Sequence, residues 1–120
     1  MGWYEQQHVD DAIAWLARHV PDRPEGTVGY ADLLAGVGLP GPAEVGVGQL
    51  ALFMGDIHRA QSVPWDSVVV NKATGVPGHG YWTINDRRDP MRDGSQVDMD
   101  FWTAQQQQVW AHVGHPNARR

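Results

Sequence analysis

Histidines and carboxylates are the residues of this sequence best suited to chemistry, because the chain contains no cysteine. A chain without cysteine has no thiolate nucleophile, no disulfide and no cysteine-ligated zinc site. None of the six histidines has a second histidine four positions away, which is the helical spacing that binds zinc. Asp56 and His58 stand two positions apart, and side chains at that spacing do not share a helix face. The sequence therefore predicts neither a metal site nor a cofactor.

A glycine-flanked histidine, His79, is the candidate for an exposed functional imidazole. Gly78 and Gly80 have no side chains that would cover the ring, so we expect solvent and partners to reach it. A general base needs a second group that orients it, and the sequence identifies none for His79. We therefore interpret His79 as a contact residue and expect the protein not to be an enzyme.

Basic residues in the second half of the chain form the set most suited to contacting phosphate groups. They are Lys72, Arg87, Arg88 and Arg92, and Asp86, Asp89 and Asp93 lie among them. The formal net charge is −5, with residues 1–66 carrying a net −6 and residues 67–120 a net +1. Proteins that bind the phosphate backbone gain affinity by releasing its counterions, so this acidic composition disfavours strong non-specific DNA binding.

The elements that must position these residues follow from apolar periodicity and from the placement of glycine and proline. We expect helices over 6–20, from about 30 to 36, over 43–60 and over 98–113, and strands over 67–71 and 81–84. Glycine and proline mark the loop over 72–80, and polar residues fill the loop over 85–96. At 120 residues the chain is expected to form a single domain, 1–120.

The order of these elements predicts an α+β, mainly helical fold of the winged-helix type. Its core, over about 27–85, holds a helix-turn-helix and a short β wing, and helices flank the core at both ends. The apolar runs are shorter than the roughly 20 residues that span a bilayer, so we expect no membrane partner. Residues 1–5 lack the start of a secretory signal, and a cytoplasmic location is therefore expected.

Two segments of this core resemble the alkylguanine-DNA alkyltransferases and the alkyltransferase-like proteins. Residues 26–34, Gly-Thr-Val-Gly-Tyr-Ala-Asp-Leu-Leu, resemble the segment that opens the helix-turn-helix of that family. Residues 62–69, Ser-Val-Pro-Trp-Asp-Ser-Val-Val, resemble the active-site segment that the family writes as Pro-Cys-His-Arg-Val. The likeness covers about half of the chain, roughly residues 27–85. It implies a winged-helix domain that binds double-stranded DNA.

The resemblance assigns roles to individual positions. Trp65 stands at the place of the nucleophilic cysteine, as a tryptophan does in the alkyltransferase-like proteins, so alkyl transfer is excluded. Asp66 stands at the place of the histidine that activates the cysteine, and Tyr30 at that of the tyrosine near the flipped nucleotide's phosphate. Glu44 stands at the place of the intercalating arginine finger, where a carboxylate repels phosphates.

Two functions of different classes remain open on the sequence alone. The first is a non-enzymatic DNA-binding module that contacts the backbone through residues of the helix-turn-helix and the wing. The second is a protein-interaction domain that kept the fold and lost the DNA surface, with its acidic side facing a basic partner. The residues expected to make contacts in either case are Tyr30, Glu44, Trp65, Asp66, Lys72, His79, Arg87 and Arg88.

Overall fold

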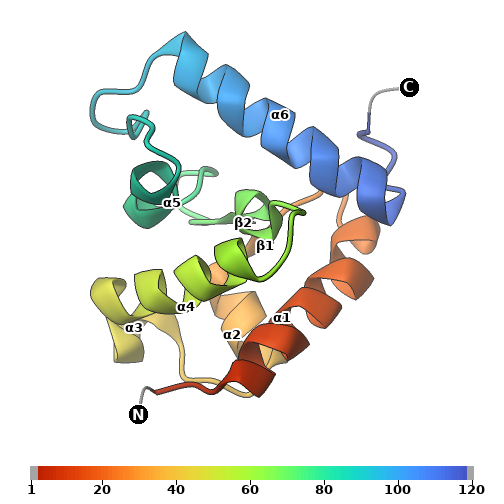
Figure 1. Cartoon of the computed structure of the whole chain (residues 1–120), viewed down its shortest axis with the longest axis vertical. Coiled ribbons are helices and arrows are strands. Elements are labelled where there is room, and N and C mark those ends of the chain that lie inside the picture. The colour runs from red at the N-terminus through yellow and green to blue at the C-terminus, as the bar shows by residue number, and fades with distance from the viewer. Residues whose placement is uncertain (1–2, 119–120) are drawn as a thin grey trace.

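Helices dominate the computed structural model, which describes residues 3–118 (Figure 1). The α-helices are α1 (Gln6–His19), α2 (Tyr30–Gly36), α3 (Pro42–Val45), α4 (Val47–Ala60), α5 (His79–Ile84) and α6 (Gln96–Val113). The remaining elements are two 3-10 helices, η1 (Val20–Asp22) and η2 (Trp65–Val68), and two strands, β1 (Val28–Gly29) and β2 (Val69–Val70). The predicted class, α+β and mainly helical, is confirmed. No helix in the described part of the chain is long and apolar enough to cross a membrane.

The first helix, α1, follows its predicted span to within one residue. It begins at a capping box in which the backbone N–H of Glu5 donates to Nδ1 of His8 at 2.9 Å. Val9 and Leu16 lie on its buried face, as the apolar spacing predicts. Pro21 is the second residue after the helix, where its missing N–H and fixed φ favour the short 3-10 turn of η1. Sequence periodicity was sufficient here because the helix packs along one apolar stripe.

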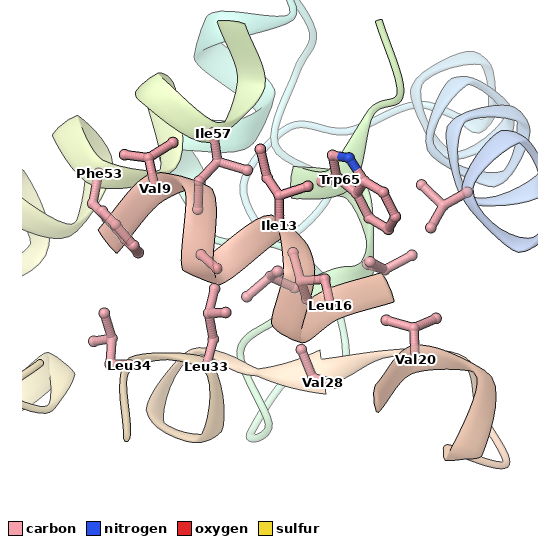
Figure 2. Packing of buried hydrophobic residues seen from close by; sticks show 14 of the residues in the cluster. Val9, Ile13, Leu16, Val20, Val28, Leu33, Leu34, Phe53, Ile57 and Trp65 are labelled. Carbon is pink, nitrogen blue, oxygen red and sulfur yellow. The ribbon is translucent and has the colours of Figure 1, made fainter. Parts of the chain in front are cut away.

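A single apolar cluster between α1, α2 and α4 forms the main core (Figure 2). Leu33 and Leu34 of α2 and Phe53 and Ile57 of α4 are each 0% exposed. Figure 2 shows Trp65 beside Ile13 of α1, on the side of the cluster that faces α6. Complete burial of aliphatic and aromatic side chains of this size stabilises the fold by roughly 1.5–3 kcal/mol each. The core therefore fixes how α2 and α4 sit relative to each other.

The expected long helix over 43–60 is interrupted at Gly46. This residue has φ +84°, a backbone conformation that L side chains rarely adopt, and it separates α3 from α4. The prediction of one helix was therefore wrong in its first turn. The consequence is a helix-turn-helix order in which α2 is followed by a short helical turn and then by α4.

The two strands form a parallel pair, in which Val28 is opposite Val69 and Gly29 is opposite Val70. The strand expected over 67–71 is shorter than predicted: only Val69 and Val70 are extended, and residues 67 and 68 belong to η2. All four paired residues are buried. The sheet joins the start of α2 to the segment after α4, and it fixes where the chain leaves β2.

The second strand of the expected wing is absent from its predicted place, because residues 81–84 belong to helix α5. Asn71 closes a tight turn by donating from its N–H to the carbonyl of Val76 at 2.9 Å. Pro77 has no N–H, and Gly78 donates its own to the hydroxyl of Tyr30, so a hairpin ladder cannot continue. Gly78 instead caps α5. The prediction of a strand over 81–84 was wrong for this reason.

The last helix, α6, covers the open side of η1 and η2. It begins at Gln96, two residues before its predicted start, because Ser95 and Asp98 form a capping box. Two indole N–H groups tie it to other segments. Trp102 donates to the carbonyl of Ser67 at 2.8 Å, and Trp110 donates to the carbonyl of Gly26 at 2.9 Å. Gly114 ends the helix in the left-handed conformation.

Candidate functional site

The first two turns of α4 carry two strongly exposed apolar side chains. Val47 is 82% exposed and Leu52 is 57% exposed, whereas Phe53 on the same helix is fully buried. Gly48, Gln49 and Ala51 are also exposed in this segment. A helix that packs against the core normally shows apolar residues on one face only. The segment Val47–Leu52 is therefore free to meet a partner, apart from Leu50, which packs partly against the core. We call this segment the free half of α4.

Small residues let α5 approach α4 closely beside this surface. A Cβ placed on Gly80 would lie 3.3 Å from Cβ of Ala51, and one placed on Gly55 would lie 3.6 Å from Cδ1 of Ile84. Larger side chains at these two glycines would push the helices apart. The packing brings His79, at the start of α5, to the same side of the molecule as the free half of α4.

Tyr30, the first residue of α2, is linked to the start of α5 by its hydroxyl. That oxygen accepts a hydrogen bond from the backbone N–H of Gly78 at 2.7 Å. Burial raises the pKa of Tyr30 to about 12, and the nearby Asp66 carboxylate acts in the same direction. The phenol is therefore neutral at physiological pH, and it anchors the end of the loop over 71–78, directly before His79. The resemblance predicts that the Tyr30 hydroxyl lies near a phosphate, but in this structure the hydroxyl already accepts the hydrogen bond from Gly78.

Asp66 is the buried carboxylate of the site, 3% exposed within η2. Its Oδ2 lies 2.9 Å from Nδ1 of His58 on α4. This hydrogen bond to Asp66 raises the pKa of the His58 imidazole, although burial opposes the rise. Within residues 3–118, Asp66 Oδ1 has no hydrogen-bond partner. This hydrogen bond, which is an ion pair when the imidazole is protonated, connects the end of α4 to η2.

Tyr81 lies on α5 within electrostatic reach of Asp66. Burial raises the pKa of its phenol, and the Asp66 carboxylate and Tyr30 add to the effect. Like Asp66 Oδ1, the Tyr81 hydroxyl is buried and has no hydrogen-bond partner in the described chain. We call His58, Asp66, Tyr30 and Tyr81 the buried polar cluster. It joins α2, η2 and α5 to the C-terminal end of α4.

His79 has the orienting partner that sequence reasoning could not identify. Its Nδ1 lies 3.3 Å from Oδ2 of Asp89, and its Nε2 lies 3.3 Å from Oγ1 of Thr83. Thr83 Oγ1 also donates to the carbonyl of His79, one helical turn earlier. The imidazole is half exposed and held between a loop carboxylate and its own helix. Asp89 is ten residues away, and no local pattern marks it as the partner.

The basic side chains are mostly engaged by carboxylates of the same chain. Lys72 Nζ lies 2.6 Å from Asp32, Arg59 lies 2.8 Å from Asp56, and Arg88 lies 3.7 Å from Asp98. The guanidinium of Arg87 instead stacks 4.2 Å above the ring of Phe101. Charge pairing of this kind leaves little excess positive surface for phosphates.

Trp65 and Glu44 lie at opposite extremes of exposure. Trp65 is 1% exposed, donates from Nε1 to Gln61 at 3.0 Å and meets the His112 ring edge-on at 5.5 Å. A ring so enclosed has no free face for a base in this conformation. Glu44 is exposed on α3, and no ion pair with it occurs among residues 3–118.

The structure thus brings part of the predicted set together. Tyr30, Asp66 and the loop of His79 meet through the buried polar cluster and Gly78. Arg87 belongs to the surroundings of Tyr81, while Arg88 is held at the start of α6. Sequence reasoning missed His58 as the partner of Asp66 and Asp32 as the partner of Lys72. Neither pairing follows from a local sequence pattern. His58 and Asp66 lie in different elements, and Asp32 and Lys72 are brought together only by the strands.

Comparison with known proteins returned no counterpart: no family model, no curated protein and no solved structure matches this chain.

Proposed function

We propose that this protein is a non-enzymatic, double-stranded DNA-binding domain, a divergent winged-helix relative of the alkyltransferase-like proteins. In this proposal the free half of α4 enters a groove, and the loop over 71–78 with α5 occupies the place of a two-stranded wing. The observation that carries the proposal is the exposure of Val47 and Leu52 at the start of the second long helix of a helix-turn-helix. Alkyl transfer to cysteine is excluded, because the chain has none.

The side chains of the free half of α4 suit a groove in shape and chemistry. Gly48 keeps the first turn of the helix narrow, which allows its backbone to come close to base edges. Val47 and Leu52 offer apolar contact to sugars or thymine methyl groups. Gln49 is exposed among them, and a glutamine amide can make a bidentate pair with adenine. Groove contacts of this kind depend less on salt than phosphate contacts do.

A matched pair of substitutions tests this interface directly. Val47→Glu and Val97→Glu both place a carboxylate in the first turn of a helix, where it is tolerated, at positions 82% and 65% exposed. We expect Val47→Glu to weaken duplex binding at least about tenfold, measured by fluorescence anisotropy at low salt, and Val97→Glu to leave it unchanged. No binding by the unmodified protein, or equal effects of the two substitutions, would overturn the proposal.

A specific observation favours a second candidate, a module that binds a basic protein. Glu44 is exposed on α3, three residues before Val47, and no ion pair engages it in the described chain. The substitution Glu44→Lys separates the candidates. Against DNA it should raise affinity about tenfold at low salt, because a cation then faces the phosphates, while Asp100→Lys on α6 should not. If the face binds protein, Glu44→Lys has no more effect on duplex affinity than Asp100→Lys.

A further inference from the structure

One carboxylate at the start of α2 holds two basic side chains. Asp32 Oδ2 lies 2.6 Å from Nζ of Lys72 and 3.8 Å from a guanidinium nitrogen of Arg23. No other carboxylate among residues 3–118 has two basic side chains within ion-pair distance. The three side chains together carry a formal charge of +1. This is therefore a local positive centre in a chain whose overall charge is negative.

The position of Lys72 is fixed by the sheet rather than by the ion pair alone. A Cβ added to Gly29 would lie 2.6 Å from Cε of Lys72 and 2.9 Å from its Cγ, so the lysine stem lies flat on that glycine. Gly29 is opposite Val70 in the strand pair, two residues before Lys72. The register of β1 and β2 thus delivers the ammonium group to Asp32, and a larger residue at position 29 would displace it.

Asp32 is well placed to be replaced by an external anion. The side chains of Asp32 and Arg23 are about one third exposed, and that of Lys72 is about two thirds exposed. The Asp32 oxygen between the two cations is itself buried, so an external anion takes its place only when the Asp32 side chain turns away. Exposed ion pairs contribute little to folding, because water and salt screen them. The hydrogen bond from Lys72 and the nearby charge of Arg23 lower the pKa of Asp32. The carboxylate therefore stays ionised and paired with both cations at physiological pH.

We propose that Lys72 and Arg23 form a phosphate-binding site whose internal occupant is the carboxylate of Asp32. The ligand is a backbone phosphate of the DNA, and this assignment rests on the proposed function. A phosphate oxygen accepts charge-assisted hydrogen bonds from an ammonium and a guanidinium as a carboxylate does. Binding exchanges one anion for another at the same two cations, so Asp32 is a built-in competitor that holds affinity down.

The substitution Asp32→Asn removes the competitor's charge with little change in shape. Duplex affinity at low salt should rise about fivefold, and the slope of log affinity against log salt should steepen by about one. Lys72→Gln should lower affinity and make the slope shallower by about one. Asp100→Asn changes the net charge equally from an exposed position on α6 and serves as the control. Equal effects of Asp32→Asn and Asp100→Asn would overturn the site.

A titration with inorganic phosphate keeps the site separate from the function. Backbone amide signals of Gly29, Asp32 and Lys72 are followed by NMR in the unmodified protein, in Asp32→Asn and in Lys72→Gln. We expect phosphate to shift these signals at lower concentration in Asp32→Asn and at higher concentration in Lys72→Gln. This result without duplex binding leaves the site standing and removes the proposed function. Identical titrations in all three proteins would remove the site, whether or not duplex DNA binds.

Discussion

The main core and the buried polar cluster meet at Tyr30 and η2 but are built on different principles. The core between α1, α2 and α4 contains fully buried apolar side chains, and shape decides its packing. The buried polar cluster contains a carboxylate, an imidazole and two phenols, and two of its polar atoms have no hydrogen-bond partner in the described chain. The core stabilises the fold, whereas the unpaired polar atoms of the cluster destabilise it through their desolvation cost. Such a cost is typical of a region kept for a purpose other than packing.

The largest effect is expected from breaking the core. Phe53→Ala removes a ring that is 0% exposed and that packs against Trp3 and Tyr4. We expect a loss of roughly 3–5 kcal/mol in the free energy of unfolding, from lost burial and from the cavity left behind. Urea denaturation followed by tryptophan fluorescence measures it. A loss below about 1 kcal/mol would show that this core tolerates voids, and the contrast with the cluster would fail.

Within the buried polar cluster, the two tyrosines provide a sharper test. Tyr30→Phe removes the acceptor of the Gly78 N–H and leaves a part-buried donor without a partner. We expect a cost of about 1–2 kcal/mol in the free energy of unfolding. Faster hydrogen exchange at the Gly78 amide should accompany it. An unchanged exchange rate at Gly78 would contradict the role of Tyr30 as the anchor of this loop.

The pH dependence of stability should reveal the ion pair between His58 and Asp66. Because the pair raises the folded-state pKa of His58, its contribution is fully present below the unfolded pKa of about 6.5. It is lost as the pH rises through the raised folded value. Urea midpoints should therefore fall with increasing pH above about 6.5, and this fall should be smaller in His58→Gln. Parallel pH profiles for the two proteins would contradict the pairing.

The smallest effect is expected from Tyr81→Phe, the counterpart of Tyr30→Phe. The Tyr81 hydroxyl is buried without a hydrogen-bond partner in the described residues, so its removal relieves a desolvation cost. We expect the free energy of unfolding to change by less than about 1 kcal/mol, in the stabilising direction. A loss as large as that of Tyr30→Phe would mean that this hydroxyl makes a stabilising bond after all.

The sequence predicted the elements that pack by periodicity and missed those defined by distant partners. The span and buried face of α1 followed from apolar spacing, because one stripe of the helix meets the core. On α4 the same spacing correctly indicated Phe53 and Ile57, but Leu52, which it also placed on the core side, is 57% exposed. Residues 81–84 were misread as a strand because two aromatic residues favour strands by propensity. Pro77 and the capping of α5 by Gly78 decided otherwise.

The candidate site was predictable in its residues more than in its pairings. Tyr30 and Asp66 were identified from the resemblance, and the structure places them within electrostatic reach of each other. The partners of Asp66 and Lys72 were not identified from the sequence. The type of a residue in one segment does not determine which distant carboxylate or imidazole packs against it. The enclosure of Trp65 depends on α6, more than thirty residues further along the chain.

The two-residue strand pair has a consequence for the order of folding. Val28 and Val69 are far apart in sequence, and closing so long a loop costs entropy that four paired residues recover poorly on their own. The pair can therefore form only after the helices between the strands have collapsed, and its amides should gain hydrogen-exchange protection late. Lys72 reaches Asp32 only through this register. The proposed phosphate-binding site of Lys72 and Arg23 therefore exists only in the completed fold, and a partly folded chain lacks it.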